Sequence, residues 1–184
     1  MSDATRSALL PFRTASAWLA AAGLLAPNED VRGRALQLLV RQLKKDPPKK
    51  LEGRAVQLLS RALSDAATSL GSEAFKASLN LEIGGGGAGT LRFAAGSMQA
   101  AVRREVLGEV MGRIQEAWAP ALLLELFADP DAGVRAEAFE FSQKRSKGKS
   151  LEPLSAAVLG KHADLKLKAI EILGKRKVEG AGAL

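Results

Sequence analysis

Basic residues gather in three short clusters, and the chemistry that such clusters support is the binding of phosphate groups. Neighbouring lysines and arginines attract a phosphate backbone and release its counterions without reading base sequence. The competing interpretation, which we favour, is that cations near a helix C-terminus complement the helix dipole and keep the surface hydrated. The clusters are Lys44, Lys45, Lys49 and Lys50; Lys144, Arg145, Lys147 and Lys149; and Lys175, Arg176 and Lys177.

A run of glycines at Gly84–Gly89 is a second place where phosphate binding has to be considered. A nucleotide-binding loop needs Gly-Lys-Ser or Gly-Lys-Thr after its glycines, and here Thr-Leu-Arg follows. Each glycine costs a helix about 1 kcal/mol, so we expect a flexible loop over residues 80–96. Apolar residues alternate on both sides of the run, which makes a small β-hairpin the alternative.

Catalytic and metal-binding constellations are largely excluded by composition. The chain has no cysteine and one histidine, His162, which rules out thiolate nucleophiles and cysteine-based metal sites. Trp18 and Trp118 are able to stack on a base, but a glycosylase needs a tryptophan, an aspartate and an arginine converging on one pocket, and the sequence does not match that set. We therefore expect no enzyme activity, cofactor, metal or small-molecule substrate, and we place both tryptophans at seams between helices and His162 in a turn.

The strongest pattern in the chain is architectural. It consists of an apolar residue, a charged residue, a spacer, a charged residue, a small or branched apolar residue and a large apolar one. Its copies are residues 31–36, 102–107, 134–139 and 165–170, the last three separated by 32 and then 31 residues. Pro120 and Pro153, which suit the first turn of a helix, keep nearly the same spacing. Such a period is typical of stacked helical repeats.

Helices are therefore expected to carry the chain, each helix that contains the pattern pairing with the helix that follows it. Residues expected to be buried between repeats are Val134, Ala138, Phe141, Leu154, Val158, Leu165, Ala169 and Ile172. The expected helices are residues 12–25; 28–45, with Asn28 as its N-cap; about 49–70; a short one over 72–79; 97–114; 119–127; one that carries Val134, Ala138 and Phe141; 151–159; and 165–176. Residues 1–79 then form an N-terminal part, 80–96 the loop, and 97–184 a regular array.

The pattern resembles HEAT repeats of the short type also found in phycobilisome-lyase-like proteins. The resemblance is carried by Asp129, Pro130, Asp131, Val134, Arg135 and Ala138, with reduced versions at Asp30-Val31-Arg32 and Asp164-Leu165-Lys166, and covers residues 28–70 and 97–178. It implies an all-α solenoid of antiparallel helix hairpins. It also implies a ladder in which the aspartate caps a helix and the basic residue reaches the aspartate of a neighbouring repeat. The ladder residues are Asp30, Arg32, Asp131, Arg135, Asp164 and Lys166.

The composition bounds the partners. Apolar residues make up 47% of the chain and aromatic residues only 4%, which suits closely stacked helices. The net charge of +7 favours an anionic partner without naming one. We expect a non-catalytic scaffold that binds another protein or a neighbouring region of a longer chain, with a nucleic-acid-binding module as the alternative.

The ends and the location of the chain give further expectations. The apolar stretch 15–26 is too short to span a bilayer, and the lack of cysteine is compatible with a reducing compartment, so we expect a cytoplasmic protein without a membrane partner. Residues 178–184 read as the turn and first residues of a partner helix that is not completed, as in a segment of a longer solenoid. Leu167 and Ile170 should then be exposed, which favours self-association.

Overall fold

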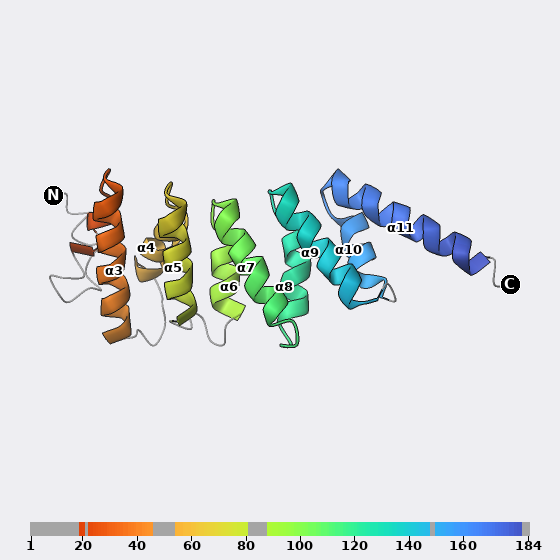
Figure 1. Ribbon diagram of the computed structural model, residues 1–184, viewed down its shortest axis with the longest axis horizontal. Helices are drawn as coiled ribbons and strands as arrows, with labels where there is room; N and C mark the ends of the chain where they lie inside the picture. Colours follow the sequence, from red (N-terminus) through yellow and green to blue (C-terminus); the bar gives the residue numbers. More distant parts are fainter. Residues whose placement is uncertain (1–18, 21, 46–53, 81–87, 148–149, 182–184) are drawn as a thin grey trace. The chain divides into compact units, whose positions relative to one another are not determined.

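In the computed structural model, all regular secondary structure among the described residues is helical, which confirms the all-α class (Figure 1). The structure describes residues 19–20, 22–45, 54–80, 88–147 and 150–181. The chain divides into two compact units, Met1–Val106 and Leu107–Leu184. The division lies inside a helix and not at the glycine run, so the expected boundaries near residues 80 and 96 do not separate the compact parts.

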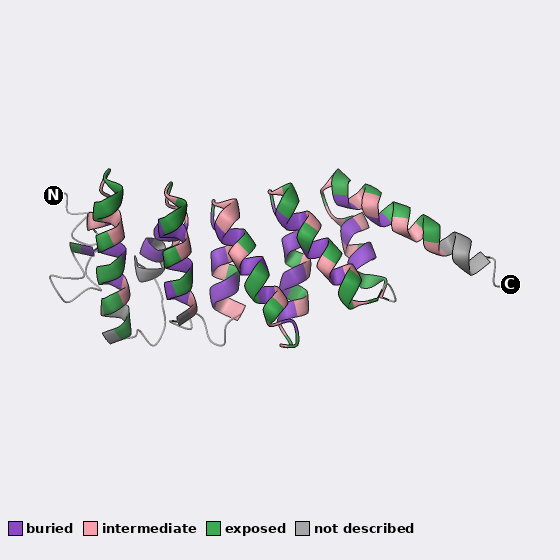
Figure 2. Cartoon of the chain, in the orientation of Figure 1, coloured by how far each residue is buried: buried purple, intermediate pink, exposed green. Residues whose placement is uncertain are grey.

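The first unit is built around α5. Its helices are α3 (Glu29–Lys45), α4 (Arg54–Leu63), α5 (Thr68–Asn80), α6 (Ala88–Ala95) and the first half of α7 (Ala100–Gly112). Helix α5 packs against α3, α4 and α6, with α3 beside it and α4 behind (Figure 1). Leu36, Leu39, Leu59, Leu63 and Phe75 are almost fully buried. Figure 2 shows buried residues on each of these helices.

The second unit is built around α9. It contains the rest of α7, then α8 (Ala119–Glu125), the 3-10 turn η1 (Leu126–Ala128), α9 (Ala132–Arg145), α10 (Glu152–Leu159) and α11 (Ala163–Ala181). Helix α9 packs against η1, α8, α10 and α11. At its core the rings of Phe127 and Phe139 meet edge to face, with centroids 5.6 Å apart.

Helix starts follow the local sequence closely. The Asn28 Oδ1 atom accepts the Val31 N–H at 3.2 Å, which caps α3 as expected. The Asp131 Oδ1 atom accepts the Val134 N–H at 3.0 Å and caps α9. Prolines stand in the first turns of α8 and α10, where their missing N–H groups cost no helical hydrogen bond.

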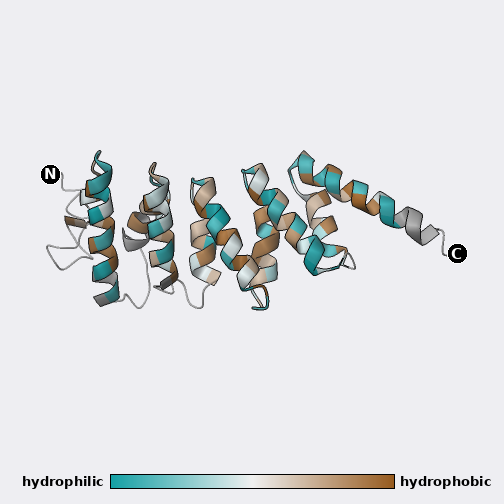
Figure 3. Ribbon diagram, viewed as in Figure 1, coloured by the Kyte–Doolittle hydropathy of each residue, from teal (hydrophilic) through white to brown (hydrophobic). Residues whose placement is uncertain are grey.

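The buried faces agree with the expected ones in part. Val134, Ala138, Leu154, Leu165 and Ala169 are buried as predicted. The other predicted positions, Phe141, Val158 and Ile172, are only half-buried, whereas Phe139 is fully buried. In α3 the buried residues are Ala35, Leu36 and Leu39, while Val31 and Leu38 are exposed. Hydrophilic and hydrophobic residues alternate along both α3 and α11 (Figure 3).

The expected helix over residues 49–70 is wrong in its second half. Residues 49–53 lie outside the described part, and α4 ends at Leu63. The chain then turns at Asp65, whose carboxylate accepts the Ala67 N–H at 2.9 Å, and α5 starts at Thr68. An aspartate that bonds the backbone two residues later favours a turn over a continuing helix.

The expected loop over residues 80–96 is also wrong in its second half. Residues 81–87 lie outside the described part, but Ala88–Ala95 form α6, and Thr90, Leu91 and Ala94 are buried. The same residues exclude the second strand of the alternative β-hairpin. Burial of this apolar face against α5 and α4 outweighs the poor helix propensity of the neighbouring glycines.

Helices pair differently from the expectation. The closest pairs are α4 with α5 and α10 with α11, so the turns containing Asp65 and His162 lie inside pairs. Helix α11 is therefore the second helix of its pair, and residues 178–181, expected to start a turn, belong to it.

Residues 12–18 of the expected first helix lie outside the described part, although Ala20 and Leu24 are buried. No described helix has both the length and the apolar character needed to cross a membrane.

Candidate functional site

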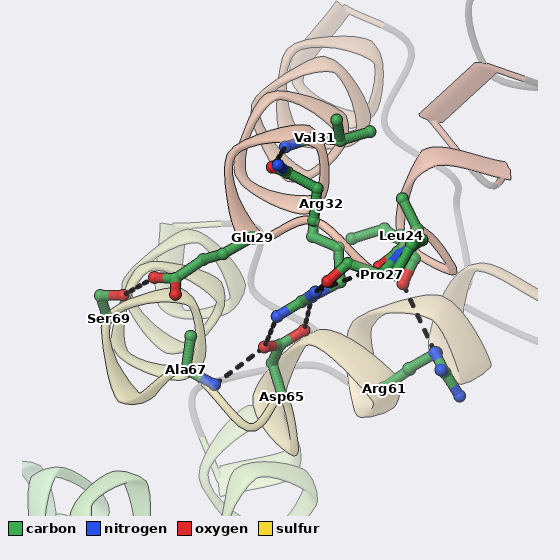
Figure 4. A network of polar contacts seen from close by, with 11 residues as sticks. Leu24, Pro27, Glu29, Val31, Arg32, Arg61, Asp65, Ala67 and Ser69 are labelled. Carbon is green, nitrogen blue, oxygen red and sulfur yellow. Dashed lines mark hydrogen bonds and ion pairs between the residues drawn. The ribbon is translucent and has the colours of Figure 1, made fainter.

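Arg32 joins two turns of the first unit by a set of polar contacts (Figure 4). Its Nε and Nη2 atoms donate to the two carboxylate oxygens of Asp65 at 2.7 and 3.0 Å. Its Nη1 atom donates to the backbone oxygens of Ala26 and Pro27 at 3.1 and 2.8 Å. The planar guanidinium thus holds the turn before α3 against the turn before α5, in the bidentate geometry that favours arginine over lysine.

The charges of this pair support each other. The hydrogen bond to Asp65 raises the pKa of Arg32, against the opposing effect of burial. Burial disfavours the charged form of Asp65, but hydrogen bonds from Arg32 and the Ala67 N–H outweigh it and lower the pKa of that carboxyl. Both side chains are mostly buried, at 14% and 8% exposure. The pair is a fixed structural contact and leaves little surface for a ligand.

Arg135 repeats the same arrangement in the second unit. Its Nη1 atom donates to the backbone oxygens of Asp129 and Pro130 at 2.8 and 3.0 Å, and its Nη2 atom to Asp164 Oδ2 at 2.7 Å. The hydrogen bond from Arg135 lowers the pKa of Asp164. Arg103, at the corresponding position of α7, donates to the Ser97 backbone oxygen at 2.8 Å. In α3, α7 and α9 an arginine side chain thus bonds backbone oxygens of the turn that precedes its own helix.

The expected ladder residues fall into three groups. Arg32, Arg135 and Asp164 form ion pairs that connect separate parts of the fold, and Asp131 caps its own helix. Asp30 is exposed and Lys166 half-buried. The partner of Arg32 is Asp65, which sequence reasoning missed because no proline or glycine marks its turn.

A groove between α3 and α5 is a surface that the sequence did not predict. Its volume is about 480 Å³. Leu36, Val40 and Ala77 supply apolar lining, and three of the four charged residues at the groove are basic. The lining residues are Leu36, Gln37, Val40, Arg41, Lys44, Glu73, Lys76 and Ala77. Spacing of three and four residues along each helix places these side chains on facing sides.

Two of the three basic clusters come together in the second unit. Lys144, Arg145 and Lys147 are exposed at the end of α9. The Arg176 Nη2 atom lies 3.4 Å from Gln143 Oε1, which places the cations of α11 beside them. Lys175 is also on α11 and donates to Glu171 of its own helix at 2.7 Å. In the remaining cluster, Lys44 lines the groove of the first unit. The other members of the three clusters have side chains outside the described part: Lys45, Lys49, Lys50, Lys149 and Lys177.

The remaining candidate residues have structural contacts. Trp118 is half-buried before α8; its Nε1 atom donates to Glu116 at 2.6 Å, and the Arg113 guanidinium lies 5.1 Å from its ring centroid. One face of this ring therefore stacks on a cation of its own chain. The Nε2 atom of His162, in the turn before α11, lies 3.3 Å from the Ala128 backbone oxygen. Trp18 lies outside the described part.

Metal-binding chemistry has no cluster to support it in the described residues, where no group of three or more His, Cys, Asp or Glu side chains converges. The groove and the basic surface of α9 and α11 are the places where these residues offer shape and charge to a partner. Comparison of the chain with protein families, curated proteins and solved structures finds no match. The role of these two surfaces therefore follows only from the side chains that form them.

Proposed function

We propose that the chain is a non-catalytic binding scaffold, an α-solenoid of HEAT-like helix pairs, and that its α3–α5 groove binds a protein partner. The repeated arginine contacts support the repeat character, because Arg32 and Arg135 each bond the turn before their own helix and an aspartate of the next helix pair. Such contacts hold neighbouring helices at a fixed separation. A rigid separation is what a groove between them requires.

The groove is the single observation that carries this proposal. It combines apolar residues of α3 and α5 with Arg41, Lys44 and Lys76 at its edges, against the one acidic residue Glu73. Grooves of this kind bind amphipathic segments, whose apolar side chains provide affinity and whose charges provide orientation. The sign of the edge charges selects an acidic segment with aliphatic anchors.

The test is a fluorescence anisotropy titration of the full chain with a labelled acidic peptide that carries two leucines four residues apart. We expect saturable binding that Arg41→Glu and Lys76→Glu weaken about tenfold or more, since each reverses a charge beside the bound segment. Lys161→Glu is the matched control, because it makes the same charge change at an exposed residue of the second unit. Equal binding by all variants, or equal binding of a peptide with serines in place of leucines, would refute the groove as the site.

A nucleic-acid-binding role is the second candidate, favoured by the adjacent cations of α9 and α11. Arginine and lysine on one surface bind a phosphate backbone with an affinity that falls steeply with salt. The triple charge reversal of Lys144, Arg145 and Lys147 should then weaken binding of a DNA duplex and flatten its salt dependence. An unchanged salt slope would remove this candidate. Peptide binding retained at high salt, with no shift of DNA or RNA mobility, would favour the protein-binding scaffold.

A further inference from the structure

Helix α11 exposes two large apolar side chains on one face, Leu167 at 69% and Ile170 at 56% exposure. Ile170 stands four residues after Lys166, as Leu36 and Phe139 stand four residues after Arg32 and Arg135. Leu36 and Phe139 are buried, with 1% and 0% exposure. The same helical position is thus covered in α3 and α9 and exposed in α11.

The covering of α9 by α11 shows what such a face binds in this fold. Two ion pairs connect the helices: Arg135 Nη2 with Asp164 Oδ2 at 2.7 Å, and Lys168 Nζ with Glu140 Oε1 at 2.6 Å. The two residues of each ion pair lie 29 and 28 positions apart in the sequence, respectively. The face of α9 that contacts α11, here called its downstream face, carries the cation Arg135 and, five residues later, the anion Glu140. The face of α11 that contacts α9, its upstream face, carries the anion Asp164 and, four residues later, the cation Lys168.

The downstream face of α11 repeats the charges of α9. Lys166 stands where α9 has Arg135, and Glu171 stands where α9 has Glu140. Lys166 is half-buried and Glu171 is exposed. An upstream helix face with an aspartate and a later cation at the matching spacing would pair with Lys166 and with Glu171, the latter in place of its bond to Lys175.

Helix α3 carries that upstream face. Asp30 and Arg34 stand two residues before and two after Arg32, as Asp164 and Lys168 stand around Lys166, and both are exposed. Val31 and Leu38 on α3 are 45% and 38% exposed, whereas Leu165, the counterpart of Val31 on α11, is 3% exposed. The face of α3 that corresponds to the covered face of α11 is therefore open and has complementary charges.

We propose that α11 of one copy binds α3 of a second copy head to tail, reproducing the α9–α11 contact. Lys166 then pairs with Asp30 of the second copy and Glu171 with its Arg34, while Leu167 and Ile170 pack near its Val31 and Leu38. Such a contact uses two different surfaces of the same chain, so it propagates into a ring or a filament. This proposal is independent of peptide binding by the groove.

Sedimentation velocity of the full chain over a concentration series, at near-physiological salt, tests the apolar part. The net charge of +7 repels copies at long range, and salt of this strength screens that repulsion beyond about 8 Å. We expect the mean mass to rise with concentration for the wild type and to stay monomeric for Ile170→Asp. Leu151→Asp is the matched control, because Leu151 is 58% exposed at the opposite end of α10 from the α11 N-terminus, and it should behave as the wild type. A monomeric wild type, or association that survives Ile170→Asp, would overturn the proposal.

A charge swap tests the register of the contact. Lys166→Asp and Asp30→Lys should each weaken association about fivefold or more, since each replaces an attractive pair by a repulsive one. The double variant restores opposite charges and should recover wild-type association, as should Arg34→Glu combined with Glu171→Arg. Far-UV circular dichroism checks that every variant is folded. Failure of both double variants to recover association would refute this pairing, even if Ile170 lies in an interface.

Discussion

Removing the charge of Asp65 should destabilise the first unit more than any comparable change at a surface carboxylate. Asp65→Asn keeps the side-chain shape and one oxygen, but it removes the charge that pairs with Arg32. The pair is mostly buried, with 14% and 8% of its side chains exposed, so water replaces the lost contact poorly. Arg32 keeps its bonds to the Ala26 and Pro27 oxygens and therefore stays in place with an uncompensated charge.

The size of the effect follows from these contacts. Hydrogen bonds to charged groups contribute about 1.5–3 kcal/mol when partly buried, and Asn replaces part of that, so Asp65→Asn should cost about 2 kcal/mol. Asp65→Ala also removes the acceptor of the Ala67 N–H, a cap of about 1 kcal/mol, and should cost about 3 kcal/mol in total. For a chain of this length each kcal/mol lowers the melting temperature by about 2–4 °C.

The same carboxylate predicts a pH dependence. Because the pKa of Asp65 is lowered in the folded chain, its contribution is complete above the unfolded pKa of about 3.9 and disappears as the pH falls through the lower folded value. The wild type should therefore lose stability faster than Asp65→Asn below about pH 4, and the two should converge in strong acid. Above pH 5 their difference should be constant.

The assay is urea denaturation followed by far-UV circular dichroism from neutral pH to pH 3, with Asp164→Asn as the control. Asp164 makes the equivalent bond to Arg135 but is 43% exposed, so its loss should cost about 0–1 kcal/mol. Equal losses for the two variants would refute the argument that burial sets the strength of these contacts. A difference between wild type and Asp65→Asn that does not shrink in acid would show that the charge is not its cause.

Further predictions concern helix packing and are checked by thermal melting. Ala138→Asp should cost about 3–5 kcal/mol, because it places an unpaired charge at a fully buried position of α9, and melting within a degree or two of the wild type would contradict this. Gly71→Ala should also destabilise, since the added Cβ would lie 2.9 Å from Val102 Cγ2 and 3.2 Å from the Leu63 oxygen. Gly108→Ala should instead stabilise by about 0.5–1 kcal/mol, because nothing lies within 4 Å of its added Cβ in α7, and no gain would contradict the exposure of that site.

Local signals in the sequence were sufficient wherever a helix boundary depends on its own residues. Asn28, Asp131 and the prolines of α8 and α10 start helices by contacts within one turn, so the sequence alone predicts them. The 31- to 32-residue spacing likewise predicts α7, α9 and α11. These elements need no knowledge of their neighbours.

Boundaries set by distant contacts were not predictable in this way. The break at Asp65 depends on Arg32, which is 33 residues away, and α6 depends on burial of Leu91 and Ala94 against other helices. The α3–α5 groove depends on the facing of Arg41 and Lys76 from separate helices. Spacing along one segment contains none of this information, because it is created only when the helices pack.

The junction between α5 and α7 is made without an arginine at the position that Arg32 has in α3. Gly71 is the fourth residue of α5, as Arg32 and Arg103 are the fourth residues of α3 and α7, and it brings no guanidinium to the turn. The junction is made instead by two serines: Ser97 Oγ donates to the Leu63 oxygen at 2.6 Å, and the Met98 N–H donates to Ser64 Oγ at 3.2 Å. The close approach of Val102 to Gly71 leaves no room for a longer side chain there. An arginine bridge and a serine bridge are therefore alternative ways to satisfy the backbone polar groups of a turn where another helix packs against it.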